Sequence, residues 1–227
     1  MAFSTAAVIP ARDEAATLAE TLRALNEIAN LYHLIVVDDH SVDSTASIAS
    51  RFGAEVLSSP ANVTGKGQAL RLGLLRALER GPEALLLADA DLGTSASRLA
   101  TLIDAIDIHH PAAIAAFPPA ASGGFGLVKT LSRRAILSRT GYAPLEPLSG
   151  QRALLLSALE ALERGIAPGF GAEVGMTIDL LSAGIRPREI PLPLTHRQSG
   201  RNLPGFAHRA RQGLDIARAL GGARIPW

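Results

Sequence analysis

Cysteine is absent from this chain of 227 residues. Without thiols the protein can form neither a disulfide framework nor a thiolate metal site, and we expect a reducing, cytoplasmic compartment. A run of about 18 apolar residues, the length that crosses a bilayer, is also missing, so no spanning helix is expected. The N-terminal stretch MAFSTAAVIPARDE has no basic region ahead of an apolar one and is not typical of a signal peptide.

An excess of charge of one sign is absent as well, since 22 basic and 21 acidic residues leave a net charge of +1. That balance does not favour nucleic acid as a partner. Locally the charge is uneven, because the segment 196–224 carries six Arg and two His against a single acid, Asp215. This segment could face phosphates, an anionic acceptor or a membrane surface. Lysine is scarce, and Lys66 and Lys129 can be weighed one by one.

The first half of the chain alternates short apolar runs with helical periods. With 48% hydrophobic residues, the length suits one substantial α/β domain. Strands are predicted at 6–9, 34–37, 55–57 and 84–88, and helices at 14–31, 44–52 and 68–80. This alternation predicts a mostly parallel sheet with right-handed crossovers.

The second half is predicted to be richer in helices, at 97–109, 127–138, 153–164, 173–183 and 206–220, with an apolar stretch at 112–117. The Pro/Gly/Ser-rich residues 118–126 are the best candidate for a mobile lid or a subdomain boundary. The segment 190–194 reads as a strand, and its two prolines, which cannot donate to a ladder, predict an edge position. The basic helix 206–220 could lie at a membrane interface or pack on the core with its arginines in water.

Acidic side chains follow the apolar run Leu85–Leu87, in the order Asp89 and Asp91. A buried strand would deliver both carboxylates to its C-terminal end, where open α/β sheets bind ligands. Two hard oxygen donors at this spacing can hold a divalent cation against phosphates. Polar loops at 10–14, 38–45 and 62–68 also follow predicted strands, so we expect all four loops at one edge of the sheet.

These blocks, in this order, resemble glycosyltransferase family 2. VIPARDEAATLAETLRAL is similar to its opening Pro-x-x-x-Glu block, and VVDDHSVDST to its second-strand motif, with His40 where Gly is commonest. GKGQALRLGL and LLADADLGT match the next two blocks, the second being the Asp-x-Asp element of the GT-A fold. SGQRAL, GFGAEVGMTIDLLSAG and IPLPLTHR resemble the polyprenyl-phosphate sugar synthase-like branch. The resemblance implies one GT-A domain over 1–227, with a nucleotide-sugar half at 1–117 and an acceptor half at 118–227.

The resemblance also implies which side chains hold the nucleotide sugar. Asp38 and Asp39 would read the base, Lys66 would reach the diphosphate, and Asp89 would lie near the ribose or the water shell of a metal. The implied contacts are Pro10, Ala11, Glu14, Asp38, Asp39, Lys66, Asp89, Ala90, Arg152, Arg197 and Arg201. Helix capping remains the alternative for Asp39, for Asp89 and Asp91, and for Asp43, where it is favoured; Glu14 could instead be a helix-dipole partner.

Metal binding and catalysis are assigned by the same resemblance. Asp91 would ligate Mg²⁺ or Mn²⁺, with His196 as a further ligand and Arg197 beside it on phosphate. Glu173 stands where inverting members carry the acid that deprotonates the acceptor. Here Val rather than Asp follows that Glu, which puts the base role in question. A phosphate acceptor would already be anionic, and Glu173 would then be orienting or structural.

Arg152 in SGQRAL could bind an acceptor phosphate or pair with Glu146. The implied activity is metal-dependent transfer of a sugar, with inversion, from a UDP- or GDP-linked donor to a polyprenyl phosphate or another small or lipid acceptor. A peripheral membrane contact and a homodimer are further expectations. Two alternatives remain open: a haloacid-dehalogenase-like phosphatase, whose Asp-x-Asp usually follows the first strand, and a non-catalytic nucleotide-sugar binding protein.

Overall fold

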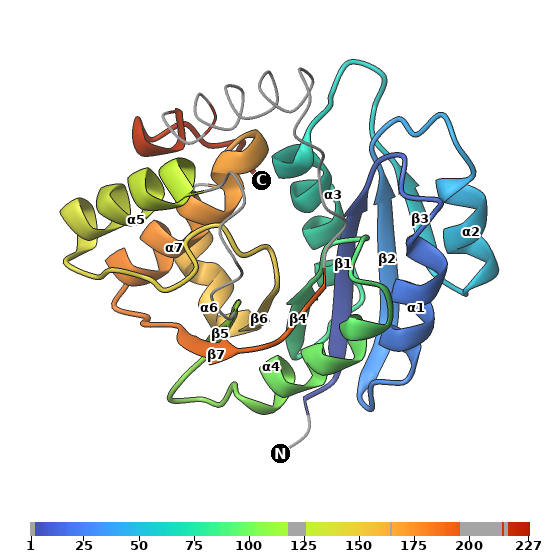
Figure 1. The fold of residues 1–227 in the computed structure, drawn as a ribbon, viewed down its shortest axis with the longest axis horizontal. Coiled ribbons are helices and arrows are strands. Elements are labelled where there is room, and N and C mark those ends of the chain that lie inside the picture. Colours follow the sequence, from blue (N-terminus) through green and yellow to red (C-terminus); the bar gives the residue numbers. More distant parts are fainter. Residues whose placement is uncertain (1–2, 118–125, 164, 196–214, 216–217) are drawn as a thin grey trace.

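The fold is a seven-stranded sheet covered by helices on both faces (Figure 1). The computed structural model describes residues 3–117, 126–163, 165–195, 215 and 218–227. The strands, in the spatial order β3-β2-β1-β4-β6-β5-β7, are β1 (Thr5–Ala11), β2 (Leu31–Asp38), β3 (Glu55–Ser58), β4 (Ala84–Leu87), β5 (Ala112–Ala116), β6 (Arg152–Leu155) and β7 (Arg188–Pro191). All neighbours except β6 pair in parallel. The predicted α/β fold with a mostly parallel sheet is confirmed.

The helical elements connect and flank these strands. They are α1 (Leu18–Asn26), α2 (Thr45–Arg51), α3 (Lys66–Glu79), α4 (Ala100–Asp104), α5 (Gly126–Thr140), α6 (Leu156–Leu159) and α7 (Ala172–Ser182), with the 3₁₀ turns η1 (Gly93–Leu99), η2 (Glu160–Leu162) and η3 (Gly169–Gly171). None of the helices in the described part of the chain has the length and apolar character needed to cross a bilayer.

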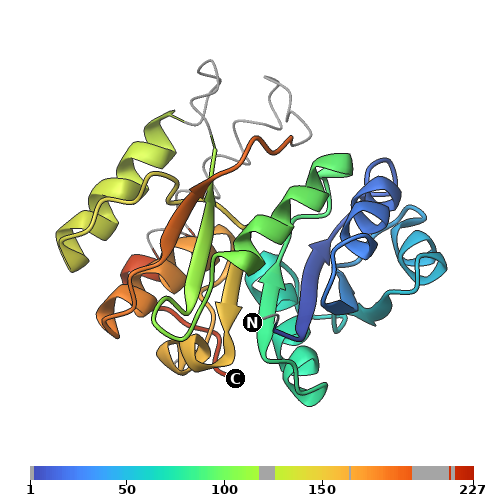
Figure 2. The same cartoon turned by 90° about the horizontal axis from the view of Figure 1, so that it is seen from below.

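Two apolar cores lie on opposite faces of the sheet, because successive side chains of a strand point to opposite sides. On one face Ile9 of β1 packs in a cluster with Leu22 of α1 and Leu99 of η1. On the other face Val8 belongs to a cluster with Leu74 of α3 and residues of α6 and α7. Figure 2 shows the helices on both sides of the sheet. The central strands β1, β4 and β5 are therefore buried on both faces, which explains their nearly continuous apolar sequences.

The prediction of a helix at 153–164 is wrong at its start. Residues Arg152–Leu155 form β6, which pairs antiparallel with β4 on one side and with β5 on the other. All four residues of this strand are buried, and so short an apolar run has the same pattern in a buried strand and in a buried helix. Because β6 runs opposite to β4, its first residue lies beside the carboxyl end of β4.

Other boundaries also differ from the prediction. The helix predicted at 97–109 is divided into η1 and α4 and ends at Asp104, and the helix predicted at 14–31 covers only 18–26. The last strand begins at Arg188 rather than at Ile190, but it lies at the edge of the sheet as its prolines indicated. Residues 118–125 of the predicted lid and most of the basic helix 206–220 lie outside the described residues.

Candidate active site

The loops that follow the parallel strands meet at one edge of the sheet, as expected. The loop after β1 contacts the loop after β2, since Asp13 Oδ1 accepts a 2.8 Å bond from Val42 N and its own N–H donates to Ser41 Oγ at 3.0 Å. Arg12 donates to Thr64 Oγ1 at 3.2 Å in the loop after β3. In the loop after β4, the carbonyl of Ala90 accepts from Thr21 Oγ1 at 2.9 Å.

Asp39 is the most unusual acid of this edge. Its backbone N–H donates to Ala11 O at 2.8 Å, and its carboxylate oxygen Oδ2 accepts from Gly65 N at 2.8 Å and from Thr64 Oγ1 at 3.1 Å. The other oxygen, Oδ1, is closed off from solvent and has no hydrogen-bond partner. An unpartnered buried acceptor costs about 1–3 kcal/mol. Asp39 therefore holds one unused acceptor in place instead of capping the following helix.

His40 connects two of the loops. Its backbone has φ of 62°, the left-handed region that favours Gly and tolerates His better than bulky or β-branched residues. This geometry explains why Gly is the commoner residue at the matching family position. The ring Nε2 lies 3.0 Å from Val63 O, so the tautomer with a proton on Nε2 donates to that carbonyl and joins the loop after β2 to the loop after β3.

Two other acids of this edge serve helix starts. Glu14 Oε2 accepts from Thr17 Oγ1 at 3.1 Å, immediately before α1. Asp43 accepts from the backbone N–H of Thr45 at 2.9 Å and of Ala15 at 3.1 Å, and the Thr45 hydroxyl bond lowers the pKa of Asp43 below its usual value. Asp38 Oδ1 accepts a longer bond, 3.3 Å, from Ser41 N.

Lys66 lies between two carboxylates in the first turn of α3. Its ammonium is 2.7 Å from Asp89 Oδ1 and 2.7 Å from Glu173 Oε1. Burial alone would lower the pKa of Lys66, but the two carboxylates outweigh burial and raise it above its ordinary value, so the amine stays charged. Glu173, in the first turn of α7, is only 3% exposed. The ammonium thus joins the loop after β4 to the helix that bears the candidate base.

The glycines beside Lys66 are required by the local structure. A Cβ on Gly67 would lie 2.3 Å from Ala167 O, so this glycine permits close packing of α3 against the segment that leads into α7. Gly65 has φ of +108°, a conformation that requires glycine at the start of α3.

The antiparallel strand β6 brings its own residues to the site. Gln151, which is fully buried, donates from Nε2 to Asp89 Oδ2, and its Oε1 accepts from Ser149 Oγ at 3.2 Å. A Cβ on Gly150 would meet Asp89 Oδ1 and Lys66 Nζ, each at 2.8 Å. Both residues lie in SGQRAL, immediately before the predicted helix, and no sequence signal indicated a role for them.

Arg152 is placed in the interior rather than on the surface. It is 0% exposed, and it donates to Ser149 O at 3.0 Å, to Thr177 Oγ1 at 3.0 Å and to Glu173 O at 2.9 Å. Burial lowers the pKa of Arg152 to about 10. The expected alternative, a pair with Glu146, is not found, because Glu146 binds Lys129. Arg152 fastens β6 to α7 and presents no exposed atom to an acceptor phosphate.

Asp91 and Asp89 are the acids of this edge that could hold a divalent cation. Both follow β4, and both are half-buried. Among the described residues no group of three or more His, Cys, Asp or Glu side chains is arranged to hold a metal. Mg²⁺ needs no such cage, since it is usually bound by one or two carboxylates together with substrate phosphates and water. The two acids therefore fit the ion, and His196, Arg197 and Arg201 lie outside the described residues.

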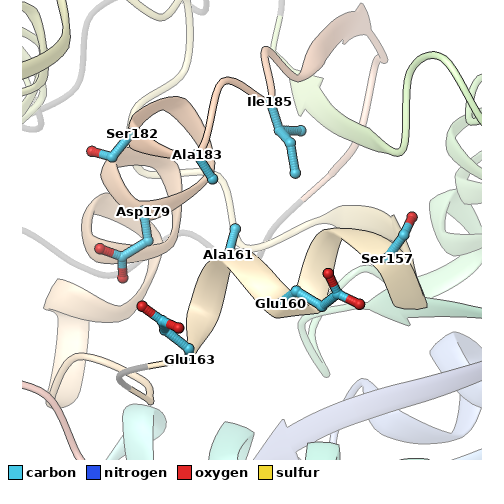
Figure 3. A pocket seen from close by; sticks show the side chains of 8 residues that line it. All are labelled: Ser157, Glu160, Ala161, Glu163, Asp179, Ser182, Ala183 and Ile185. Carbon is cyan, nitrogen blue, oxygen red and sulfur yellow. The ribbon is translucent and has the colours of Figure 1, made fainter.

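A separate cavity of about 700 Å³ opens at the far end of α7 (Figure 3). It is lined by Ser157, Glu160, Ala161, Glu163, Asp179, Ser182, Ala183 and Ile185. Asp179 is the lining residue of α7 nearest in sequence to Glu173, and about 9 Å of helix separates the two. Three acids in its lining disfavour a phosphate-bearing ligand in this cavity.

Comparison with known proteins agrees with this geometry. A family model described as glycosyl transferase family 2 matches residues 6–156. Polyprenol monophosphomannose synthase of Mycolicibacterium smegmatis is 26% identical over an alignment of 217 residues that covers 86% of this chain and 79% of that protein. This likeness agrees with the resemblance to the polyprenyl-phosphate branch.

Solved structures show the same fold. Glucosyl-3-phosphoglycerate synthase from Mycobacterium tuberculosis, in complex with Mn²⁺, UDP and glucosyl-3-phosphoglycerate, matches with a TM-score of 0.76 at 24% identity, covering 98% of this chain and 81% of that one. The same enzyme with Mg²⁺ and UDP gives a TM-score of 0.77 at 23% identity, with the same coverage. The phosphatase alternative is dropped, because the family model covers well over half of the sequence. The chain belongs to glycosyl transferase family 2, and it is a glycosyltransferase.

Proposed function

We propose that this enzyme transfers a sugar from a uridine-diphosphate sugar, with Mg²⁺ or Mn²⁺, to an acceptor that carries a phosphate, with inversion at the anomeric carbon. The observation that carries the choice of donor is the unpartnered Oδ1 of Asp39. Metal dependence and inversion are proposed from the resemblance to other members of the family. A peripheral membrane contact and a homodimer remain predictions of the sequence.

The nucleotide base of the donor is proposed from the number of hydrogen-bond acceptors that Asp39 offers. Uracil presents one ring N–H between two carbonyl groups, whereas guanine presents a ring N–H beside an amino group and needs two acceptors side by side. Asp39 has one unused oxygen, since Gly65 and Thr64 already bind the other. This arrangement fits uracil. Arg12, whose side chain is 57% exposed and which is bonded to Thr64, is the flexible group that would move to admit the base.

The diphosphate would lie between Asp91 and Lys66. When bound, the divalent ion supplies charge stabilisation for the leaving nucleoside diphosphate. Lys66 is charged in the free enzyme and already oriented by Asp89 and Glu173, so it can supply a positive charge without having to gain a proton. Ala90 and Pro10 contribute backbone at the same edge, where Pro10 belongs to β1 and the Ala90 carbonyl is fixed by Thr21.

A phosphate-bearing acceptor is proposed from the state of Glu173. This carboxylate is buried, and its Oε1 is already engaged by the Lys66 ammonium at 2.7 Å, so it is poorly placed to take a proton from an acceptor hydroxyl. An acceptor phosphate is anionic and attacks without losing a proton. Glu173 would therefore orient Lys66 and would not remove a proton from the acceptor. The products named for both relatives, phosphomannose and glucosyl-3-phosphoglycerate, contain phosphate.

The test of the donor is a panel of UDP, GDP and UDP-glucose, each with Mn²⁺, Mg²⁺ or EDTA, followed by thermal unfolding and by calorimetric binding. We expect stabilisation by the uridine compounds that EDTA removes, and little from GDP. In Asp39→Asn the amide can place its N–H against the uracil N–H, so UDP should bind about tenfold more weakly or worse. The exposed Asp104→Asn is the matched control. Tighter binding of GDP than of UDP would overturn the donor assignment.

Transfer itself needs a separate measurement. Release of UDP from UDP-glucose and other uridine-diphosphate sugars should rise when polyprenyl phosphate or a small phosphorylated acceptor is added. Tight binding of UDP with no transfer to any of these acceptors would point instead to a non-catalytic nucleotide-sugar binding protein.

A further inference from the structure

We infer that Gln151 is a positioning residue that fixes the Asp89 carboxylate for the donor, so that the acceptor half of the chain sets the geometry of the donor site. The inference rests on the proposed function, because it assigns Asp89 to the nucleotide-sugar site. It concerns the residue that leads directly into β6, the strand that the sequence did not predict.

Both oxygens of Asp89 are held by residues distant in sequence. Oδ1 lies 2.7 Å from the Lys66 ammonium, and Oδ2 accepts a hydrogen bond from Gln151 Nε2. Together these two donors determine the rotation of the carboxylate, which follows β4 and is itself only half-buried. A carboxylate fixed at both ends keeps one orientation before any ligand arrives, which lowers the entropy lost on binding.

The amide of Gln151 can have only one orientation here. Its Oε1 accepts from Ser149 Oγ at 3.2 Å, and its Nε2 donates to Asp89. The reverse orientation would place the amide oxygen against a carboxylate and leave both acceptors without a proton. Gln151 is also 0% exposed, so water cannot replace the lost donor.

The loop that carries Gln151 is itself immobilised. Gly150 leaves no room for a side chain, since a Cβ there would be 2.8 Å from both Asp89 Oδ1 and Lys66 Nζ. Arg152, next along the chain, donates to Ser149 O at 3.0 Å and to Glu173 O at 2.9 Å. The turn is thus hydrogen-bonded to α7 on one side and in close contact with the Lys66–Asp89 ion pair on the other.

Replacing the amide by a carboxyl group tests this geometry without changing its shape. In Gln151→Glu the amide donor is lost and a carboxyl group takes its place beside the Asp89 carboxylate. Two carboxylates repel each other, so Asp89 should lose the orientation that Gln151 gives it.

The first measurement is binding of UDP-glucose with Mn²⁺ by calorimetry at about pH 8, relative to the unsubstituted enzyme. Gln151→Met keeps the volume but removes the donor, and it should bind about tenfold more weakly. Gln151→Glu should bind more weakly still. Asn26→Asp, which makes the same change of charge at an exposed position of α1, should bind normally.

The second measurement separates positioning from a general structural role. In Gln151→Met the KM for UDP-glucose should rise about tenfold while the KM for the acceptor stays unchanged. A merely structural role would change both values. In thermal unfolding without ligand, Gln151→Glu should be less stable than Gln151→Met, because only the first variant places two carboxylates side by side.

The outcomes separate the two proposals. If the unsubstituted enzyme binds no uridine nucleotide, the proposed donor is wrong, and the order of stability of the two Gln151 variants still decides whether Gln151 holds Asp89. If the enzyme binds UDP-glucose but Gln151→Met binds it equally well, or the KM values for donor and acceptor rise together, the positioning role of Gln151 is overturned.

Discussion

The ammonium of Lys66 and the carboxylate of Glu173 lie 2.7 Å apart, and this contact joins the first turn of α3 to the first turn of α7. The same ammonium binds Asp89 at 2.7 Å, so one cation joins the acid that follows β4 to the acid of α7. Because Glu173 is 3% exposed, removing the cation would leave a buried negative charge without its ion-pair partner.

The first prediction concerns stability and activity of Lys66→Met. Breaking a buried pair costs about 3–5 kcal/mol, and the partial exposure of Lys66 reduces our expectation to about 2 kcal/mol of unfolding free energy. Adding Glu173→Gln should recover part of that loss, which urea unfolding of both single variants and the double variant will measure. Turnover should fall by about 100-fold or more, since a charge near the leaving group is removed.

Lys129→Met is the matched control, because Lys129 is the other lysine of the chain and binds the buried Glu146. It should lose stability by a similar mechanism and keep its turnover at temperatures where it is folded. Equal losses of turnover in the two lysine variants would show that Lys66 acts through stability alone.

The second prediction concerns Asp91→Asn. The neutral amide is a weaker ligand for Mg²⁺ or Mn²⁺ than a carboxylate, while the loop after β4 keeps its shape. We expect the unfolding temperature without ligand to change little, the stabilisation by UDP with Mn²⁺ to disappear, and turnover to fall by about 100-fold or more. Near-normal turnover with an unchanged Mn²⁺ requirement would remove Asp91 from the metal site, and Asp104→Asn serves as the control here too.

The first half of the chain was predictable because its sequence and its topology follow the same rule. In β1 and β4 the apolar run stops where the polar loop begins, and parallel strands bring those loops to one edge. The loops that carry Asp39, Lys66 and Asp89 therefore came together as predicted from strand order alone. The pattern could not show which oxygen of Asp39 binds Gly65 and which is unpartnered.

The second half was less predictable because the local pattern of β6 does not distinguish a strand from a helix. The four residues from Arg152 to Leu155 are all buried, and nothing in their periodicity distinguishes a strand from a helix. From the sequence, the Arg at the first position is expected at the surface. Its burial depends on its three partners, Ser149 and two residues of α7, which lie near it only in the folded protein. Gln151 was missed for the same reason: its role exists only once β6 lies beside β4.

The third prediction tests the backbone at His40. With φ of 62°, any residue with a Cβ is strained there by about 1 kcal/mol relative to Gly. His40→Ala keeps the strain and loses the bond to Val63 O, so it should be the less stable variant. His40→Gly loses the same bond but relieves the strain, and should be more stable than His40→Ala by about 1 kcal/mol in urea unfolding. Equal stability of the two variants would contradict the left-handed conformation.

The fourth prediction concerns Tyr142. Burial and the hydrogen bond to Glu189 raise the pKa of its phenol to about 12. Ultraviolet absorbance should therefore show a step of phenol ionisation near that pH, and Tyr142→Phe should remove it.

The sign of the linked stability follows from the direction of that shift. Since the folded-state pKa of Tyr142 is raised, its contribution to stability is complete below about pH 10, the unfolded value, and is lost as the pH rises toward the folded-state pKa of about 12. Unfolding by urea along this range should show a steeper loss for the unsubstituted protein than for Tyr142→Phe. Glu189 also accepts from Leu145 N at 2.6 Å and Glu146 N at 3.1 Å, so the segment before β6 should loosen first. If the absorbance step that Tyr142→Phe removes lay at about pH 10, Tyr142 would be exposed to water and not held by Glu189.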